Sequence, residues 1–338
     1  MNNIYIALSA HHVMYCESIS KINTSHNNIL ITLEGIKFDK SIFNSVIFVG
    51  HSVYNQSNSK VEKIKNIFYK IKSYKKVVNK LKHLKNNKNI TVYFSSLEDV
   101  LSNYLLLNFS KDTQGVVFED GMLNYYEHTI NDVSAINFKL KKIIALLHGL
   151  SYTNYKGHTS GIDYDRVKYQ LVRVPELSIR PNKSKTLPLV KYNSFKLNDD
   201  ILIVGQEPYG NIYGKDFYLE KIKQLIDLIK LDSEFTENKQ IFYKPHRHGP
   251  RIKASFLDNN FKNTVTYIED NISIENIYFN KIRCKNIYTI DSSAVFSIFQ
   301  DAPQDVRNQL KISVMPFKKS TLTLLFSKLN FINLKNDI

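Results

Sequence analysis

The chain of 338 residues has a hydrophobic fraction of 43% and an aromatic fraction of 12%, which excludes disorder as its global state. Its 46 Lys and Arg against 31 Asp and Glu give a formal net charge of +15, which indicates an acidic partner: nucleic acid, an anionic membrane surface or an acidic substrate. Two cysteines, Cys16 and Cys284, exclude a disulfide framework and a four-cysteine zinc site. With no signal-peptide pattern and no run of about 18 apolar residues, we expect a cytoplasmic protein of about two domains.

In the first half, short apolar runs alternate with longer helical patterns, which favours a mostly parallel sheet with helices on both faces. The predicted strands are 3–9, 29–33, 45–49, 90–94 and 115–119, and 167–172 is also strand-like. The predicted helices are 12–22, 61–84, 97–108 and 135–147.

The composition changes over 180–200, and the polar segment 180–188 with Pro181 and Pro188 predicts a linker, so we expect domains at 1–190 and 191–338. The second half repeats the pattern, with strands at 201–204, 240–244, 264–268, 286–290 and 311–314 and helices at 217–231, 273–279 and 294–300. We therefore expect an α/β fold of two doubly wound domains facing a central cleft. Ligands of such folds bind at the carboxyl ends of the strands.

Several common motifs are absent: GxxxxGK[ST], GxGxxG, HExxH, GxSxG and a paired CxxC. Asp163 and Asp165 have the spacing of a pair that can hold a metal on a sugar-nucleotide diphosphate. So short a signal is more typical of a polar turn. We therefore predict no metal site.

An acidic pair and a glycine, Glu119-Asp120-Gly121, follow the strand predicted at 115–119. Glycine lets the backbone turn sharply, which presents the carboxylates at the strand end. One of them is placed to act as general base on a hydroxyl. The alternative is a solvated turn.

A cationic loop begins at the end of the strand predicted at 240–244. It contains Lys244, His246, Arg247, His248 and Arg251. Stiffened by prolines and a glycine, it is a candidate phosphate clamp in which histidine also offers a proton. The alternative is a basic surface loop.

Two further signals lie near predicted helix starts. Ser292 and Ser293 follow the strand at 286–290, where hydroxyls and backbone N–H groups bind phosphate or simply cap the helix. Glu275 is a candidate for holding ribose hydroxyls, or an ordinary acid of a helix first turn.

Together these features resemble the bacterial sialyltransferases of the lipo-oligosaccharide, O-antigen and polysialic acid type. Their hallmarks are a [D/E]-[D/E]-G motif, an HP motif usually written K-x-H-P, and an S-[S/T] motif. The first and third match Glu119-Asp120-Gly121 and Ser292-Ser293. Lys244-Pro245-His246-Arg247 departs from the second, because an arginine stands where the family has proline. An apolar strand that ends in Gly205-Gln206 also fits.

The resemblance implies a GT-B-like fold of two Rossmann-like domains, with the acceptor side and the base in 1–190 and the CMP-sugar donor in 191–338. It implies inverting transfer of sialic acid from CMP-sialic acid to a sugar hydroxyl of a bacterial surface glycan, without metal or cofactor. Asp120 is then the base, Glu119 its neighbour, and His246 the group that meets the departing phosphate. The implied donor-binding residues are Gly205, Gln206, Lys244, Arg247, His248, Glu275, Ser292 and Ser293.

The positive charge is concentrated in a basic amphipathic pattern at 61–84, which suits a helix lying on anionic lipid at the inner membrane face, where a lipid-linked acceptor is presented. The alternative is a domain helix with a solvated lysine face. The segment 318–328 is a second candidate of this kind.

Two other functions stay open. The same fold can use another CMP-activated acidic sugar, such as a pseudaminic, legionaminic or Kdo donor. From a different class, a basic protein that binds nucleic acid or another polyanion without catalysis fits the pI near 9.4. We disfavour nucleic acid as a partner, because no recognisable binding motif is present and the acidic pair has no role there.

Overall fold

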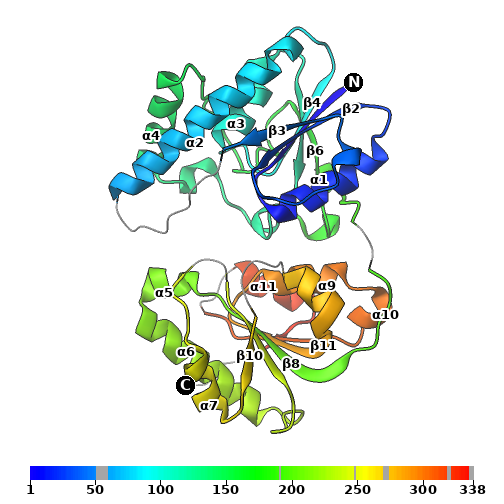
Figure 1. Cartoon of the computed structure of the whole chain (residues 1–338), viewed down its shortest axis with the longest axis vertical. Coiled ribbons are helices and arrows are strands. Elements are labelled where there is room, and N and C mark those ends of the chain that lie inside the picture. The colour runs from blue at the N-terminus through cyan, green and yellow to red at the C-terminus, as the bar shows by residue number, and fades with distance from the viewer. Residues whose placement is uncertain (51–59, 190–191, 247–248, 269–273, 318–320, 335–338) are drawn as a thin grey trace. The chain divides into compact units, whose positions relative to one another are not determined.

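The computed structural model describes residues 1–50, 60–189, 192–246, 249–268, 274–317 and 321–334 (Figure 1). The chain divides into two compact units, Met1–Leu189 and Val190–Ile338, called unit 1 and unit 2 below. Each unit is built on its own parallel sheet.

Unit 1 contains a seven-stranded sheet in the order β3-β2-β1-β4-β5-β6-β7, in which every neighbouring pair is parallel. The strand order reverses direction at β1, as in doubly wound folds. The strands are β1 Asn2–Ala7, β2 Asn27–Leu33, β3 Ser45–Val49, β4 Ile90–Phe94, β5 Gln114–Phe118, β6 Val167–Val172 and β7 Ser184–Thr186.

Helices cover both faces of this sheet, because side chains of successive strand residues point to opposite sides. Ile4 and Ile6 of β1 pack in one core with α2, whereas Tyr5 and Ala7 pack in another core with α1. The helices are α1 Ala10–Ile22, α2 Lys60–Leu81, α3 Val100–Tyr104 and α4 Ala135–Leu147, with a π-helical turn Leu105–Phe109 after α3.

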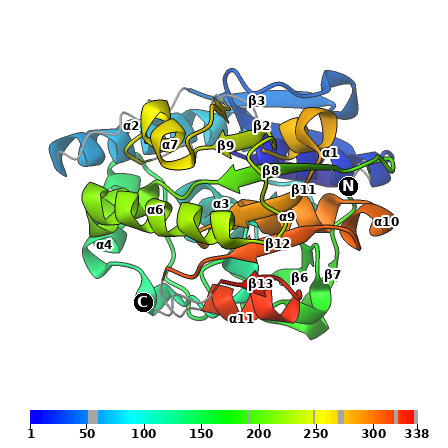
Figure 2. The ribbon, with the colours of Figure 1, turned by 90° about the horizontal axis from the view of Figure 1, so that it is seen from below.

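Unit 2 contains a six-stranded parallel sheet in the order β10-β9-β8-β11-β12-β13, in which the part from β9 to β13 is labelled in Figure 2. The strands are β8 Asn198–Val204, β9 Ile241–Lys244, β10 Val265–Tyr267, β11 Cys284–Thr289, β12 Lys311–Val314 and β13 Ile332–Asn333. The helices are α5 Pro208–Tyr213, α6 Lys215–Leu231, α7 Ala254–Phe261, α8 Ile274–Ile277, α9 Ala294–Asp301, α10 Gln304–Arg307 and α11 Thr321–Lys328. Helices α6 and α7 share a core with β8 and β9.

The α/β fold with two parallel sheets is confirmed, but the predicted linker at 180–188 is wrong, because this segment belongs to unit 1. Residues 184–186 form β7, which pairs with β6 and extends the sheet of unit 1, and Leu187 is buried. A three-residue edge strand next to prolines shows neither alternation nor apolar bias, so its sequence looks like a loop.

The amphipathic pattern at 61–84 corresponds to α2, and most of its apolar stripe is core. The side chains of Ile71, Tyr74, Val77, Val78 and Leu81 are buried, as the alternative of a domain helix predicts. In the segment 318–328, residues 318–320 lie outside the described residues, and α11 buries Leu325 and Phe326. No helix within the described part of the chain is long and apolar enough to cross a membrane.

Candidate active site

The acidic motif lies where β5 leaves the sheet of unit 1. Glu119 is fully buried, and its carboxylate accepts hydrogen bonds from Arg173 Nη1 at 3.0 Å, the Arg173 backbone N–H at 2.8 Å and the Tyr125 hydroxyl at 2.5 Å. Burial raises the pKa of the Glu119 carboxyl, and the facing Arg173 guanidinium offsets part of that rise. Glu119 therefore ties β5 to the end of β6, and its oxygens face protein donors.

Asp120, the next residue, points to a different environment. Its side chain is 43% exposed, and its Oδ1 lies 3.1 Å from Nε2 of His12. Its backbone N–H donates to Asn124 Oδ1 at 3.0 Å, which fixes the turn. Gly121 adopts a φ of +54°, a conformation that most side chains disfavour. The carboxylate of Asp120 is thus accessible to solvent and has an imidazole beside it.

His12 was not among the residues expected from the sequence. It stands in the first turn of α1, where its backbone N–H donates to the Oγ of the N-cap Ser9 at 3.2 Å. Its ring packs edge-on against Phe118 at 5.2 Å between centroids. The short connection after β1 therefore places His12 at the same sheet edge as Asp120, from 108 residues away in the sequence.

Arg173, which pairs with Glu119, also contacts two side chains of α1. Arg173 lies over the ring of Tyr15, with 5.3 Å from its Cζ to the centroid, and its Nη2 is 3.4 Å from Nε2 of His11. The Tyr15 hydroxyl also hydrogen-bonds His11. The ends of β1, β5 and β6 are therefore joined through side chains that the sequence motifs do not include.

In unit 2, a buried carboxylate holds the cationic loop. Glu207 is fully buried after β8, accepting from the Tyr243 hydroxyl and from the His246 backbone N–H, both at 2.6 Å. Burial raises the pKa of the Glu207 carboxyl, and these two donors partly offset that rise. A Cβ on Gly205 would lie 2.4 Å from the Tyr243 hydroxyl oxygen, so only glycine fits beside this contact. The loop after β9 is thereby fixed to the turn after β8.

Lys244 and Glu275 come together near this contact. Both side chains are buried, and burial together with the Arg251 charge lowers the pKa of Lys244, which Glu207 and Glu275 oppose. Arg251 Nη1 donates to the carbonyl of His246 at 2.7 Å. Two cationic side chains and two carboxylates therefore surround the backbone that carries His246.

The Ser-Ser motif follows β11, which pairs with β8. Ser292 is buried, and Ser293 is the N-cap residue of α9 without a side-chain capping bond. Asp291 before them adopts a φ of 47° and accepts the Phe317 backbone N–H at 2.7 Å. This places both serines at the same sheet edge as Gly205.

The structure thus gathers the predicted residues into two sets, each at the carboxyl ends of parallel strands. Unit 1 contributes Glu119 and Asp120, and unit 2 contributes Gly205, Gln206, Lys244, His246, Glu275, Ser292 and Ser293. The Gln206 backbone N–H donates to the Tyr218 hydroxyl at 2.7 Å. Arg247 and His248 lie outside the described residues.

Asp163 of the alternative metal pair has another role. Arg180 Nε donates to its Oδ1 at 2.7 Å, and the His158 backbone N–H donates to its Oδ2 at 2.9 Å. Burial acts to raise the pKa of the Asp163 carboxyl, but the hydrogen bonds from Arg180 and His158 outweigh it, so the pKa lies below its usual value. Across the described ranges, no group of three or more His, Cys, Asp or Glu is arranged to hold a metal ion.

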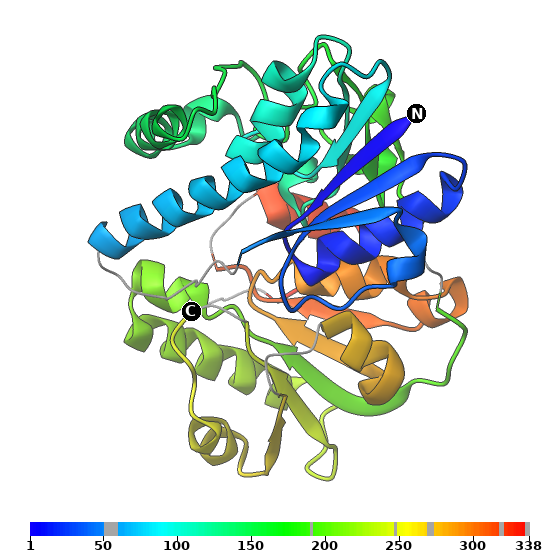
Figure 3. The same cartoon turned by 45° about the horizontal axis from the view of Figure 1, so that its top comes forward.

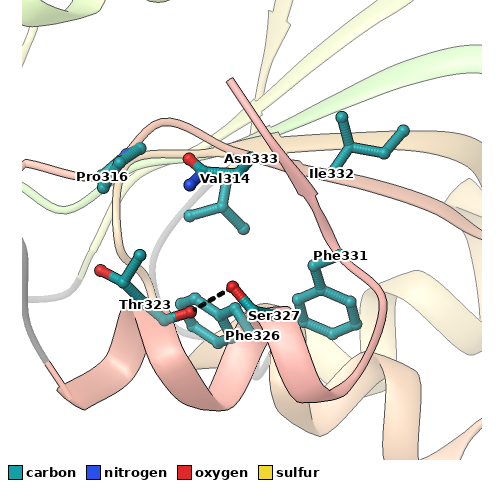
Figure 4. A pocket seen from close by; sticks show the side chains of 8 residues that line it. All are labelled: Val314, Pro316, Thr323, Phe326, Ser327, Phe331, Ile332 and Asn333. Carbon is teal, nitrogen blue, oxygen red and sulfur yellow. Dashed lines mark hydrogen bonds between the residues drawn. The ribbon is translucent and has the colours of Figure 1, made fainter. Parts of the chain in front are cut away.

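One small pocket lies between β12, β13 and α11 and is lined by none of the predicted site residues (Figure 4). Its volume of about 10 Å³ is close to that of one water molecule, so it is too small for a sugar or a nucleotide. It is lined by Val314, Pro316, Thr323, Phe326, Ser327, Phe331, Ile332 and Asn333.

Solved structures with the same architecture identify the fold of this chain. The GT-B domain of the sialyltransferase from Photobacterium damselae matches with a TM-score of 0.53 at 12% identity, covering 98% of this chain and 97% of that one. The calicheamicin glycosyltransferase CalG4 matches with a TM-score of 0.53 at 9% identity, covering 99% and 85%. Another structure of a sialyltransferase from Photobacterium damsela has a TM-score of 0.51 at 13% identity, covering 99% and 81%. The chain has the GT-B fold of glycosyltransferases.

A family model described as alpha-2,8-polysialyltransferase (POLYST) matches residues 3–299. The chain belongs to this family and is a glycosyltransferase, and the membership supports a sialyltransferase activity. No curated protein sequence matches the chain. The expected resemblance to sialyltransferases is confirmed at the level of the family, whereas the assignment of individual motif residues stays a prediction.

Proposed function

We propose that the protein transfers sialic acid from CMP-sialic acid to a sugar hydroxyl of a bacterial surface glycan, with inversion at the anomeric carbon and without metal or cofactor. The observation that carries this proposal is the contact of 3.1 Å between the accessible Asp120 carboxylate and His12 in a chain of this family. The family description points to an acceptor that itself ends in sialic acid, and the net charge of +15 suits such an anionic chain.

In the proposed reaction, unit 1 supplies the base. An acceptor hydroxyl lies against Asp120, and its oxygen attacks the anomeric carbon of the donor as the bond from that carbon to the phosphate oxygen breaks. The hydroxyl proton passes to Asp120 Oδ, and His12 Nε2 orients this carboxylate. A single displacement of this kind inverts the anomeric centre. Glu119 keeps Arg173 and the end of β6 in place.

Unit 2 binds the donor in this proposal. CMP leaves as a phosphate monoester, whose negative charge suits His246 and Lys244, with Arg247 and His248 as further donors. Ser292, Ser293 and the backbone N–H groups that begin α9 bind the same phosphate.

Glu275 accepts hydrogen bonds from the ribose hydroxyls, while Gly205 and Gln206 bring the backbone close to the nucleotide. A monophosphate needs less charge neutralisation than a diphosphate, which fits a reaction without Mg²⁺.

Thermal unfolding with CMP, UDP or a random oligonucleotide tests this proposal. A ligand that binds only the folded protein stabilises it, by about 2.7 kcal/mol at a concentration 100 times its Kd. We expect a higher melting temperature with CMP alone. Stabilisation by the oligonucleotide but not by CMP would favour the polyanion-binding alternative. Turnover of CMP-sialic acid against CMP-activated pseudaminic, legionaminic and Kdo sugars then identifies the donor.

A further inference from the structure

Helix α4 of unit 1 exposes a row of aliphatic side chains. Their spacing places them on one face of the helix, opposite the buried Ala145. Aliphatic side chains that stay largely exposed contribute little to folding stability, and several of them on one helix face are typical of an interaction site. The row consists of Ile136, Ile143, Leu146 and Leu147, which are 58–78% exposed.

The first turns of α2 extend this row. The rings of Phe68 and His148 lie 4.6 Å apart between centroids, and Lys75 Nζ donates to the carbonyl of Gly149 at 3.2 Å, so α2 passes the end of α4. Both helices lie side by side in Figures 1 and 3. Ile64 and Phe68 of α2 are exposed, although later positions of the same stripe are buried. We call the exposed side chains of Ile64, Phe68, Ile136, Ile143, Leu146 and Leu147 the α2–α4 face.

The charge carried by α2 and α4 is mostly positive, although Lys70 of α2 pairs with Asp99 and Lys141 of α4 pairs with Glu98. The two helices contain 8 and 3 lysines, eleven in all, and one acid, Glu62. Lys139 and Lys142 are exposed beside the aliphatic row of α4, and Lys65 and Lys72 are exposed on α2. Apolar residues with flanking lysines are the pattern of a helix that lies in a membrane interface.

We propose that the α2–α4 face binds the surface of a bilayer that contains anionic phospholipid. The aliphatic side chains enter the boundary between headgroups and acyl chains, while the lysine stems extend so that their ammonium groups meet lipid phosphates. Charge complementarity favours an anionic bilayer over the other partners that an apolar face could bind. A second copy of the chain would bring its own lysines against these lysines, and like charges across an interface are costly. Nucleic acid would leave the aliphatic row unpartnered.

This inference differs from the expectation based on the whole pattern at 61–84. The C-terminal part of α2 is committed to the core, so only its first turns are free to contribute, and α4 supplies most of the apolar surface. The inference concerns binding only, and it does not depend on the donor, the acceptor or the base of the proposed reaction.

The absence of tryptophan from the sequence allows a direct test on the full chain. Leu146→Trp places the protein's single indole on the α2–α4 face. Leu231→Trp is the matched control, because Leu231 is the same residue type, is 82% exposed and ends α6 of unit 2. With vesicles of phosphatidylglycerol and phosphatidylcholine, we expect the emission of the first variant to shift to shorter wavelength and that of the control to stay unchanged. No shift for Leu146→Trp, or equal shifts for both, would overturn the proposal.

Vesicle flotation supplies the affinity. Replacing Ile143, Leu146 and Leu147 together by Ser should weaken binding by about tenfold or more, because three largely exposed aliphatic groups lose their contact with lipid. Replacing Lys139 and Lys142 by Glu should weaken binding to anionic vesicles to a similar extent, about tenfold.

The melting temperature and the turnover of a soluble acceptor should not change in either variant, since these side chains are exposed. Equal binding of the wild type to pure phosphatidylcholine would refute the role of the lysines. A dimer in sedimentation that the Ser variant dissociates, with vesicle binding unaffected, would assign the face to a second copy instead.

Discussion

Glu119 and Asp120 are neighbours in one motif, yet their surroundings predict opposite responses to the loss of a charge. In Glu119→Gln, one carboxylate oxygen becomes an amide NH₂ that faces donors of Arg173 and Tyr125. The guanidinium of Arg173, whose side chain is only 1% exposed, loses its counter-charge. Removing one partner of a buried ion pair costs about 3–5 kcal/mol.

For a unit of this size, each kcal/mol lowers the melting temperature by about 2–4 °C, so the variant should melt about 6–20 °C below the wild type. Differential scanning calorimetry on the full chain measures the shift. Glu98→Gln is the matched control in unit 1: Glu98 pairs with Lys141, but both side chains are about a quarter exposed. Loss of such a pair should cost less than about 1 kcal/mol.

Asp120→Asn should behave in the opposite way. The half-exposed carboxylate contributes little to stability, so the melting temperature should stay near that of the wild type while turnover falls by about 10²–10⁴-fold. CMP affinity should be retained, since the base contacts the acceptor. A Glu119→Gln protein that melts like the wild type but has no turnover, together with an active Asp120→Asn protein, would refute this division of roles.

Three further results are expected. His246→Ala should weaken CMP binding in calorimetry by about 1.5–3 kcal/mol and lower kcat; loss of CMP binding in His248→Ala with retention in His246→Ala would reverse the choice of histidine. Glu207→Gln should lower CMP affinity by loosening the loop after β9. It should also remove a pH dependence of the stability. Folding raises the pKa of Glu207 above 4.5, so as the pH rises from 4.5 through the raised pKa, the unfolding free energy of the wild type falls relative to that of the variant. Turnover should be unchanged by EDTA. A loss of turnover that Mg²⁺ restores would contradict the metal-free reaction and favour a metal site at Asp163 and Asp165.

The local sequence was sufficient to predict the α/β architecture and the placement of polar motifs at strand ends. Runs such as 90–94 and 201–204 are almost wholly apolar and are buried along their length, as expected of strands covered on both faces. A glycine or a serine pair directly after such a run marks the turn where functional side chains emerge. For the same reason the positions of Asp120 and Ser292 just after strands were predictable without any knowledge of contacts, while their roles stay predictions.

Partners that meet only in the folded sheet were not identifiable. His12 reaches Asp120 because β1 and β5 end at the same edge, and no spacing rule relates positions 108 residues apart. Glu207 was not among the residues expected from the sequence, although folding buries it against Tyr243. The apolar stripe of α2 shows a further limit, since helical periodicity identifies an apolar face without saying which turns meet the core.

The strained backbone of Asp291 positions a side chain that connects two turns of unit 2. Its φ of 47° lies in a region that glycine occupies without steric penalty and that costs other residues about 1–2 kcal/mol. A glycine here would relax the turn, but the backbone N–H of Phe317 would lose its acceptor. The aspartate therefore joins the turn after β11 to the turn after β12. The turn that carries Ser292 and Ser293 is therefore connected through Phe317 to the ring of Tyr209, 4.4 Å away between centroids.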